Sequence, residues 1–415
     1  MGWLCFQNMN ALAEPIATTL RCTEPLPTRR HREIVRHMML DGGKWDAQVG
    51  DVAVLAPFAL VLPRQVWVML AAEAEELTRE LFVLEQALLH RPALWPRLGV
   101  PARVRRALEK EQPWTPSAAR VMRFDFHPTT DGWRISEVNS DVPGGFNEAS
   151  TFTALVAEDF PGFRPAGDPL GALADALAAQ ARHLPRMALL AAPGHPADLQ
   201  VVHGLATALR QRGVEAIPAR PEQLSWSDGR AYLASGSERQ PIGVIYRFFN
   251  AEWLARIAGD GWHPLFRGGL TPVCNPAAAV LSESKRLPLL WAELGMPVPT
   301  WSRLLPVNRP ARTAAGSGNW LLKGAYSNNG ESVLGRGWRS RPGFGGAMLH
   351  AMIRPGSWVA QRRFDSLALP TPEGPMHPCL GVYTVEGRTT GIYARLSPQP
   401  MIDYLARDVA VLVED

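Results

Sequence analysis

Cysteine is scarce in this sequence, and the spacing of its cysteines argues against two kinds of site. The four are Cys5, Cys22, Cys274 and Cys379. They lie far apart and form no CxxC pair, so we expect neither a zinc site nor a disulfide framework, and a reducing cytoplasm fits best. The N-terminal stretch MGWLCFQNMNALAEP also lacks the basic and apolar segments of a signal peptide.

Long apolar runs are also lacking. The most apolar window, residues 52–70, contains two prolines and an Arg-Gln pair. A membrane span needs about 20 nearly uninterrupted apolar residues, so no membrane partner is expected. The net charge is +4, but the arginines do not form a run. We therefore expect no nucleic-acid partner.

Two common nucleotide-binding motifs are absent as well. Neither GxGxxG nor GxxxxGK[ST] occurs in the chain, although residues from 186 onward read as strand, helix, strand and a further strand at 241–249. Short links between such elements predict a parallel α/β unit. Dinucleotide-binding and Walker-type functions therefore lack their main evidence.

Lysine is the fourth scarcity. Of the 43 basic residues only four are lysines, which leaves 39 arginines. They are Lys44, Lys110, Lys285 and Lys323. Lysine offers a compact charge that suits a phosphate in a narrow pocket, where a planar guanidinium fits badly. Chance is the alternative, and it explains Lys110, in a solvated helix, better than the other three.

A polar hairpin is the most informative feature that is present. In RFDFHPTTDGWRISEVNS (123–140), alternation places Arg123 and Asp125 on one face of a strand, and Glu137 and Asn139 on one face of the next. If Arg123 lies opposite Glu137, these side chains share a surface. Mg²⁺ takes such oxygen ligands together with substrate phosphates. A hairpin whose charges face water is the alternative that these residues leave open.

The remaining pattern gives a coarse element order. Residues 1–50 read as irregular, 65–110 as amphipathic helix, and SESKRLPLLWAELG (282–295) as another helix. Lys323 ends an apolar strand before the loop GAYSNNGE, an arrangement that can hold ATP phosphates. The strand WVAQ (358–361) is a candidate for hydrogen-bonding adenine through its backbone. A surface lysine and an ordinary core strand are the alternatives.

Taken together and in this order, the motifs resemble the synthetase part of the glutathionylspermidine synthase family, circularly permuted ATP-grasp ligases. The resemblance spans residues 40–415. It rests on the stretches GGKWDAQVGD, RFD…WRISEVNSD, GVIYRFFNAEW, NPAAAVLSESKRLPLLW, LLKGAYSNNGESV, WVAQ and LGVYTVEGRTTGIYARLS…DVAVLVE.

The resemblance implies a set of site residues. The metal ligands would be Asp125, Glu137 and Asn139, and the catalytic residues Arg123 and Arg395. ATP would be bound by Arg123, Lys285, Lys323, Gly324, Asn329, Trp358, Val359, Ala360, Gln361 and Arg395. The chain departs from the family at Lys323-Gly324, where Lys-Pro is common, and at DVPGG, where Asp-Thr or Asp-Ser is commoner. Cys379 stands at a position where a polar residue can contact ATP.

The resemblance also implies a fold and a reaction. We expect an α/β protein made of α+β lobes, with a helical region and metal-binding hairpin at 1–180, a Rossmann-like preATP-grasp domain at 181–278 and a nucleotide-binding region at 279–415. The expected activity joins a small-molecule or peptide carboxylate to an amine, with ATP and Mg²⁺ as cofactors.

Substrate identity and two rival functions remain open. A polyamine acceptor would need acidic residues, for which Asp141, Glu148 and Glu252 are candidates unless they are exposed charges. The alternatives are an ATP-dependent phosphotransferase that uses the same site and a non-catalytic ATP-binding protein. A purely structural protein explains neither the hairpin nor the lysines.

Overall fold

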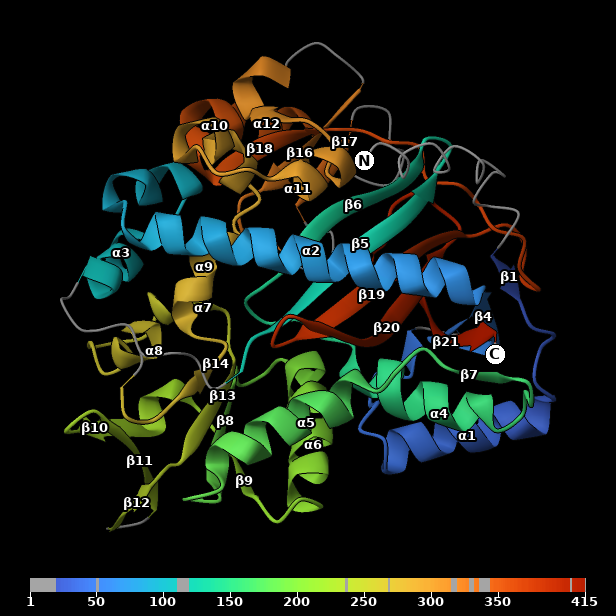
Figure 1. Cartoon of the computed structure of the whole chain (residues 1–415), viewed down its shortest axis with the longest axis horizontal. Helices are drawn as coiled ribbons and strands as arrows, with labels where there is room; N and C mark the ends of the chain where they lie inside the picture. Colours follow the sequence, from blue (N-terminus) through green and yellow to red (C-terminus); the bar gives the residue numbers. More distant parts are fainter. Residues whose placement is uncertain are drawn as a thin grey trace, which may run out of the picture.

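The chain is a mixed α/β protein, as expected. The structure is a computed structural model that describes residues 20–49, 52–109, 119–235, 238–267, 269–314, 319–327, 332–335, 344–403 and 405–414. Its strands form five sheets within these ranges (Figure 1). No helix in the described ranges is long and apolar enough to cross a membrane.

The largest sheet has eight strands and forms the centre of the molecule. In sheet order the strands are β1 (Arg21–Cys22), β4 (Leu55–Leu62), β21 (Arg407–Glu414), β20 (Arg388–Ser397), β19 (His377–Val385), β5 (Val121–Thr129) and β6 (Gly132–Asn139), with β7 (Phe163–Pro165) pairing beside β21. β4 and β21 are parallel, whereas the other neighbours are antiparallel. The C-terminal segment is therefore a central strand of this sheet.

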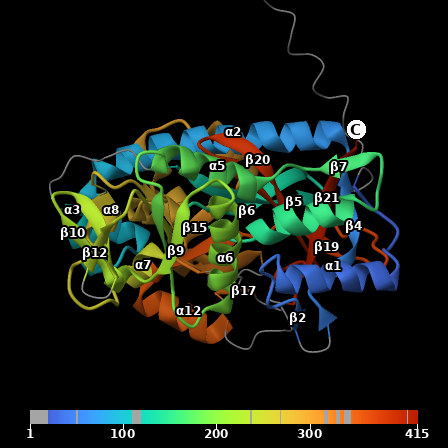
Figure 2. The ribbon, with the colours of Figure 1, turned by 90° about the horizontal axis from the view of Figure 1, so that it is seen from below.

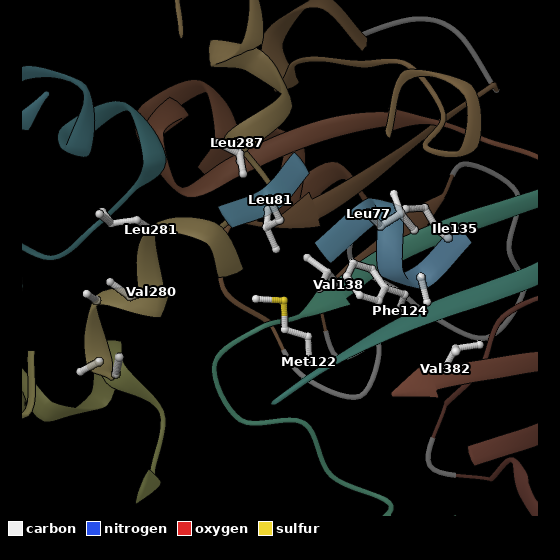
Figure 3. Close-up of a cluster of buried hydrophobic side chains, with 14 of the residues drawn as sticks. Leu77, Leu81, Met122, Phe124, Ile135, Val138, Val280, Leu281, Leu287 and Val382 are labelled. Atoms are coloured by element: carbon white, nitrogen blue, oxygen red, sulfur yellow. The ribbon is translucent and has the colours of Figure 1, made fainter. Parts of the chain in front are cut away.

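Helices cover both faces of this sheet. The long helix α2 (Arg64–Leu89) runs along one face, and α1 (Thr28–Leu40) lies on the other (Figure 2). Leu77 and Leu81 of α2 pack against Phe124 of β5 in a buried cluster (Figure 3). Burial of one such side chain contributes about 1.5–3 kcal/mol, so this contact holds β5 firmly on α2. The opposite face of β5 is then free to present its polar side chains.

A smaller parallel sheet lies beside the main one, within the segment predicted to be Rossmann-like. Its order is β14 (Val273–Cys274), β13 (Val244–Phe248), β8 (Arg186–Ala191) and β9 (Glu215–Ala219). Helix α6 (Pro196–Arg210) connects β8 to β9, and α5 (Pro169–Ala181) packs against α6. A three-stranded antiparallel sheet follows: β10 (Leu224–Ser227), β11 (Arg230–Ser235) and β12 (Glu238–Pro241).

A third unit, drawn in orange at the top of Figure 1, is a four-stranded antiparallel sheet with helices. Its order is β15 (Asn308–Pro310), β18 (Trp358–Arg362), β16 (Trp320–Gly324) and β17 (Val333–Gly335).

The remaining strands and α-helices are β2 (Gln48–Val49), β3 (Val52–Ala53), α3 (Ala102–Glu109), α4 (Thr153–Ala157), α7 (Ala251–Leu254), α8 (Pro264–Arg267), α9 (Val280–Glu283), α10 (Trp291–Leu294), α11 (Pro299–Leu304) and α12 (Phe344–Ile353).

Three predicted elements differ from the structure. Residues 1–50 are not irregular throughout, because α1 lies within them and buries Ile34 and Met38. The helix predicted for 65–110 ends at Leu89, since the following segment contains Pro92 and Pro96 and turns as a 3₁₀ helix. The helix predicted for 282–295 is broken, because α9 ends at Glu283 and the next residue is extended. Lys285 therefore lies in a turn.

Candidate functional site

One polar cavity is lined by residues of the main sheet, of α6 and of the third unit, the four-stranded antiparallel sheet. Its volume is about 370 Å³. Seven predicted site residues line it: Arg123, Asp125, Glu137, Asn139, Lys323, Gln361 and Arg395. The cavity thus lies between the hairpin and Lys323, whose ammonium lies 2.9 Å from the Ser136 carbonyl although 187 positions separate the two residues in the chain. Cys379 also lines the cavity.

The hairpin presents its polar residues through an irregularity in its pairing. Arg123 lies opposite Asn139 and not opposite Glu137, so the condition considered for a shared surface is not met, although the side chains still line one cavity. Phe124 pairs with Val138 and Phe126 with Ile135, which leaves two residues of β6 opposite the single residue Asp125. Such a bulge bends a strand and redirects side chains. Ser136 and Glu137 both line the cavity as a result.

Asp125 forms a two-point ion pair with Arg123. The guanidinium Nε lies 2.7 Å from Oδ1 and Nη2 lies 3.0 Å from Oδ2, while Nη1 donates to the Gly144 carbonyl at 2.9 Å. Burial raises the pKa of Asp125. The charge of Arg123 and its hydrogen bonds have a larger effect in the opposite direction, so the pKa lies below its ordinary value. The carboxylate is ionised, and Oδ1, which accepts only from Arg123 Nε in the described residues, keeps a lone pair for another ligand.

The two predicted ATP lysines approach the hairpin from different sides. Lys323 donates to the Ser136 carbonyl at 2.9 Å, and burial, opposed by Glu137, lowers its pKa to about 8. Lys285 lies 3.4 Å from a Glu137 oxygen and donates to the Ser327 carbonyl at 2.9 Å. It lines a smaller adjoining cavity that shares Glu137 with the larger one. Glu137 therefore faces both the cavity with Lys323 and the cavity with Lys285.

Four further residues predicted to bind ATP, three of them in the strand predicted to contact adenine, are placed differently. Gly324, Trp358, Val359 and Ala360 do not line the main cavity. β18 lies between β15 and β16, and its residues Val359–Gln361 have a partner on both sides. A central strand offers its backbone groups to its neighbours, so adenine recognition through WVAQ is restricted to the ends of the strand. Asn329 lies outside the described residues.

The donor set of the hairpin fits a hard cation. Asp125 and Glu137 supply carboxylate oxygens, and the Asn139 amide nitrogen donates to Asp125 Oδ2 at 3.3 Å, which leaves its amide oxygen as a ligand atom. No group of three His, Cys, Asp or Glu side chains suited to a metal occurs in the described ranges. Two carboxylates and an amide are the oxygen donors that Mg²⁺ prefers. His127 and Cys379 also line the cavity, and the His127 Nε2 atom is taken up by Ser136 Oγ at 3.0 Å.

A second charged cluster at the cavity wall was not predicted. The Lys44 ammonium lies 3.0 Å from Asp46 Oδ1, 2.7 Å from Glu148 Oε1 and 2.9 Å from Asp408 Oδ2. All four residues line the cavity, and Lys44 is only 5% exposed. Lysine scarcity singled out Lys44 in the sequence, but nothing there indicated that Glu148 and Asp408, from distant segments, share its ammonium with the neighbouring Asp46.

A network of hydrogen bonds fixes the loop that carries Lys44. Asn147 donates to the carbonyls of Gly43, at 3.3 Å, and Gln200, at 2.9 Å. The Gln200 side chain in turn accepts from the backbone of Trp45. Gly43 has φ +69°, a conformation that glycine adopts at little cost. The GGKWD motif is therefore a rigid turn that directs Lys44 inward.

Asp141 belongs to a structural junction and does not line the cavity. Its oxygens accept from the Arg247 guanidinium and from the backbone N–H of Ala251, at 2.9 Å for the latter. The Asn275 amide donates to the carbonyls of Val121, Ser140 and Asp141 at 2.7, 3.0 and 3.0 Å. Asp141 is thus neither an exposed charge nor a wall of the cavity.

The described cysteines are free thiols, namely Cys22, Cys274 and Cys379, and Cys5 lies outside the described residues. Burial raises the pKa of Cys274 to about 12 and also raises that of Cys379. Both thiols therefore stay protonated and are poor nucleophiles.

The fold and site define a mixed α/β protein with a cavity lined by cationic and acidic side chains. The family model described as "Glutathionylspermidine synthase preATP-grasp" matches residues 58–414, so the chain belongs to this family. A search of curated protein sequences finds no match. Among solved structures, a proposed gamma-glutamylcysteine synthetase from Methylobacillus flagellatus KT is 13% identical, with 80% of this chain and 88% of that chain covered and a TM-score of 0.41. A similarity at that level supports no further conclusion.

Proposed function

We propose that this protein is an ATP- and Mg²⁺-dependent ligase of the ATP-grasp type that joins a carboxylic acid to an amine. One observation supports this most strongly. Three cationic side chains, Arg123, Lys323 and Arg395, and three oxygen donors, Asp125, Glu137 and Asn139, line a single cavity. Membership of the glutathionylspermidine synthase preATP-grasp family supports the same reaction class.

The proposed reaction solves a leaving-group problem. A carboxylate is a poor acyl donor because its leaving group would be oxide. Transfer of the γ-phosphoryl group of ATP to a carboxylate oxygen gives an acylphosphate and ADP. The amine then attacks the acyl carbon and phosphate leaves. The protein mainly positions the reactants and neutralises developing charge.

The metal ligands, the lysines and the arginines have different roles in this reaction. Asp125, Glu137 and Asn139 would hold Mg²⁺, which neutralises phosphate charge. Lys323 and Lys285 now donate to backbone carbonyls, neutral acceptors that phosphate oxygens can replace with stronger, charge-assisted bonds. Arg395 lies opposite Cys379 on the neighbouring strand of the main sheet. With Arg123 it stabilises charge on the transferring phosphoryl group.

An ADP-release screen tests the proposal. Purified protein is incubated with ATP, Mg²⁺ and paired peptide acids and amines, with glutathione among the acids and diamines among the amines. We expect ADP release that requires both an acid and Mg²⁺, and an amide product when the amine is present. A stable phosphorylated product, formed without any amine, would instead favour the phosphotransferase alternative. ADP release that is independent of every acid would contradict the ligase assignment.

A further inference from the structure

The cluster around Lys44 has no part in the proposed phosphoryl transfer, although Glu148 is one of the acidic residues considered for a polyamine acceptor. Two of its three carboxylates are nearly buried: the side chain of Glu148 is 11% exposed and that of Asp408 is 4% exposed. The side chain of Asp46 is 47% exposed. Two buried carboxylates therefore share one buried ammonium. The buried part of the cluster carries an excess negative charge, and it lies at the wall of the reaction cavity.

Glu148 is the member of the cluster best placed to take up a proton. The groups that face it are Lys44 from the GGKWD turn, Asp408 from β21, Tyr383 from β19 and Tyr393 from β20. Burial raises the pKa of Glu148, Asp408 raises it further and Lys44 opposes both, with a raised pKa as the result. A carboxylate with raised proton affinity is a better general base than an ordinary one.

Tyr393 connects this cluster to the arginines of the proposed phosphoryl site. Its hydroxyl donates to Asp408 Oδ1 at 2.6 Å. The guanidinium carbons of Arg123 and Arg395 lie 5.4 and 5.9 Å from the centre of its ring. A single side chain thus spans from the carboxylate cluster to the place where the acylphosphate would be stabilised.

We propose that Glu148 accepts the proton that the attacking amine loses, and that Lys44 is a positioning residue that holds Glu148 in place. This inference rests on the proposed ligase function. The incoming ammonium first gives one proton to the Glu148 carboxylate. The neutral amine nitrogen then bonds to the acyl carbon, the bond from that carbon to the phosphate oxygen breaks, and phosphate leaves with the electron pair. The second proton on nitrogen passes to the departing phosphate, as it would with hydroxylamine.

The chemistry of the acceptor makes a base necessary. An alkylamine, like a lysine side chain, has a pKa of about 10 and enters the cavity mostly as an ammonium ion. It becomes a nucleophile only after losing a proton. Hydroxylamine, by contrast, is already a neutral base at neutral pH and captures acylphosphates without such help. The two acceptors therefore separate proton removal from acyl activation.

The test compares the two acceptors in the variant Glu148→Gln. Glutathione and a panel of peptide acids serve as acyl donors, and propylamine or hydroxylamine serves as acceptor; the amide and the hydroxamate are measured. We expect Glu148→Gln to lower amide formation from propylamine by about 100-fold or more. Hydroxamate formation should stay within a few-fold of the wild-type rate. The control is Glu158→Gln, the same change at a carboxylate that is 64% exposed, which should alter neither product.

The positioning role of Lys44 has a separate readout. Without its ammonium, Glu148 would need a higher pH to ionise, so Lys44→Met should move the acidic limb of the rate profile for propylamine to higher pH. Lys44→Arg keeps the charge and should restore most of the wild-type profile, and it also serves if Lys44→Met fails to fold. A Lys44→Met profile of unchanged shape would show that Lys44 is merely structural.

The outcomes distinguish the inference from the proposed function. If wild-type protein forms no hydroxamate from any acid of the panel, the ligase function is wrong and the inference falls with it. If Glu148→Gln loses both products equally, or loses neither, Glu148 is not the proton acceptor, although the ligase function stands.

Discussion

Glu137 and Asp141 are four residues apart in one stretch of chain, yet their carboxylates meet opposite environments. Asp141 lies in the junction between the main sheet and the parallel sheet, where Arg247 and the backbone of Ala251 occupy its oxygens. Glu137 lies on the bulge of β6 and faces a cavity, with Lys285 at 3.4 Å as its ion-pair partner. Both carboxylates have a cationic neighbour, but only Glu137 has space for a ligand.

The difference shows which kind of buried charge indicates function. A buried ion pair whose hydrogen bonds are all made within the protein joins parts of the fold. A charged group at a cavity wall, held by long or few contacts, retains lone pairs and donors for a ligand. Arg123 and Asp125 combine the two cases, because they pair with each other and still line the cavity.

The largest effect should come from breaking the junction. Asp141→Asn leaves the Arg247 guanidinium, which is fully buried, without its counter-charge. Removing one partner of such a pair costs about 3–5 kcal/mol of unfolding free energy. Urea denaturation measures the loss. A change below about 1 kcal/mol would show that the junction is not the structural element described.

The corresponding change at the cavity, Glu137→Gln, should reduce turnover more than it reduces stability. Glu137→Gln removes one proposed Mg²⁺ ligand while keeping size and polarity, so Mg²⁺-dependent ADP release should fall about 100-fold, or about 2.7 kcal/mol. Its unfolding free energy should fall by less than that of Asp141→Asn, because the buried Lys285 ammonium keeps Glu283 as a second acidic neighbour. Together the two variants contradict the comparison if both lose stability alike or both lose turnover alike.

A smaller effect is expected when the charge of Lys323 is kept but its shape is changed. Lys323→Arg places a larger, planar guanidinium in a narrow site, and a lost charge-assisted contact costs about 1.5–3 kcal/mol. ATP affinity measured by calorimetry should therefore fall about 10- to 100-fold. Lys110→Arg is the control; Lys110 lies outside the described residues and is predicted from the sequence to be solvated. Equal behaviour of the two variants would remove Lys323 from the set of phosphate ligands.

The smallest effect concerns pH and Glu252. Burial and the nearby Asp141 raise its pKa from the ordinary 4.5 to about 7. The folded protein keeps this carboxyl protonated in a pH range where the unfolded chain ionises, so its contribution to stability falls as pH rises from 4.5 to 7. Glu252→Gln should therefore gain up to about 2 kcal/mol relative to wild type between pH 5 and 8, with allowance for partial solvent screening. If the free energies of unfolding of Glu252→Gln and wild type changed with pH in the same way, this prediction would be wrong.

Much of the site followed from local sequence patterns. Alternation in β5 predicted correctly that Arg123 and Asp125 share one face, because Phe124 and Phe126 must be buried on the other. The strand that ends at Lys323 was predicted from its apolar run, and the cleft between it and the hairpin is present. These features depend on periodicity and composition, which a single sequence contains.

The remaining features depend on tertiary contacts. The bulge at Ser136 and Glu137 reflects pairing between two strands and has no sequence signal of its own. The break before Lys285 occurs where Ser284 donates to the Leu98 carbonyl, 186 residues away. The separation of Asp141 from Glu137 likewise depends on Arg247, which the sequence places in another segment. A local sequence pattern carries no information about contacts between residues that lie so far apart in the chain.

The central claim is that the cavity activates a carboxylate through an acylphosphate. The most direct measurement uses the acid that gives the largest ADP release, with both carboxylate oxygens labelled with ¹⁸O, in the presence of ATP, Mg²⁺ and an amine. Phosphate released from an acylphosphate retains one oxygen of the acid. We therefore predict one ¹⁸O atom in each inorganic phosphate, detected by mass spectrometry. Amide formation with unlabelled phosphate would contradict the account.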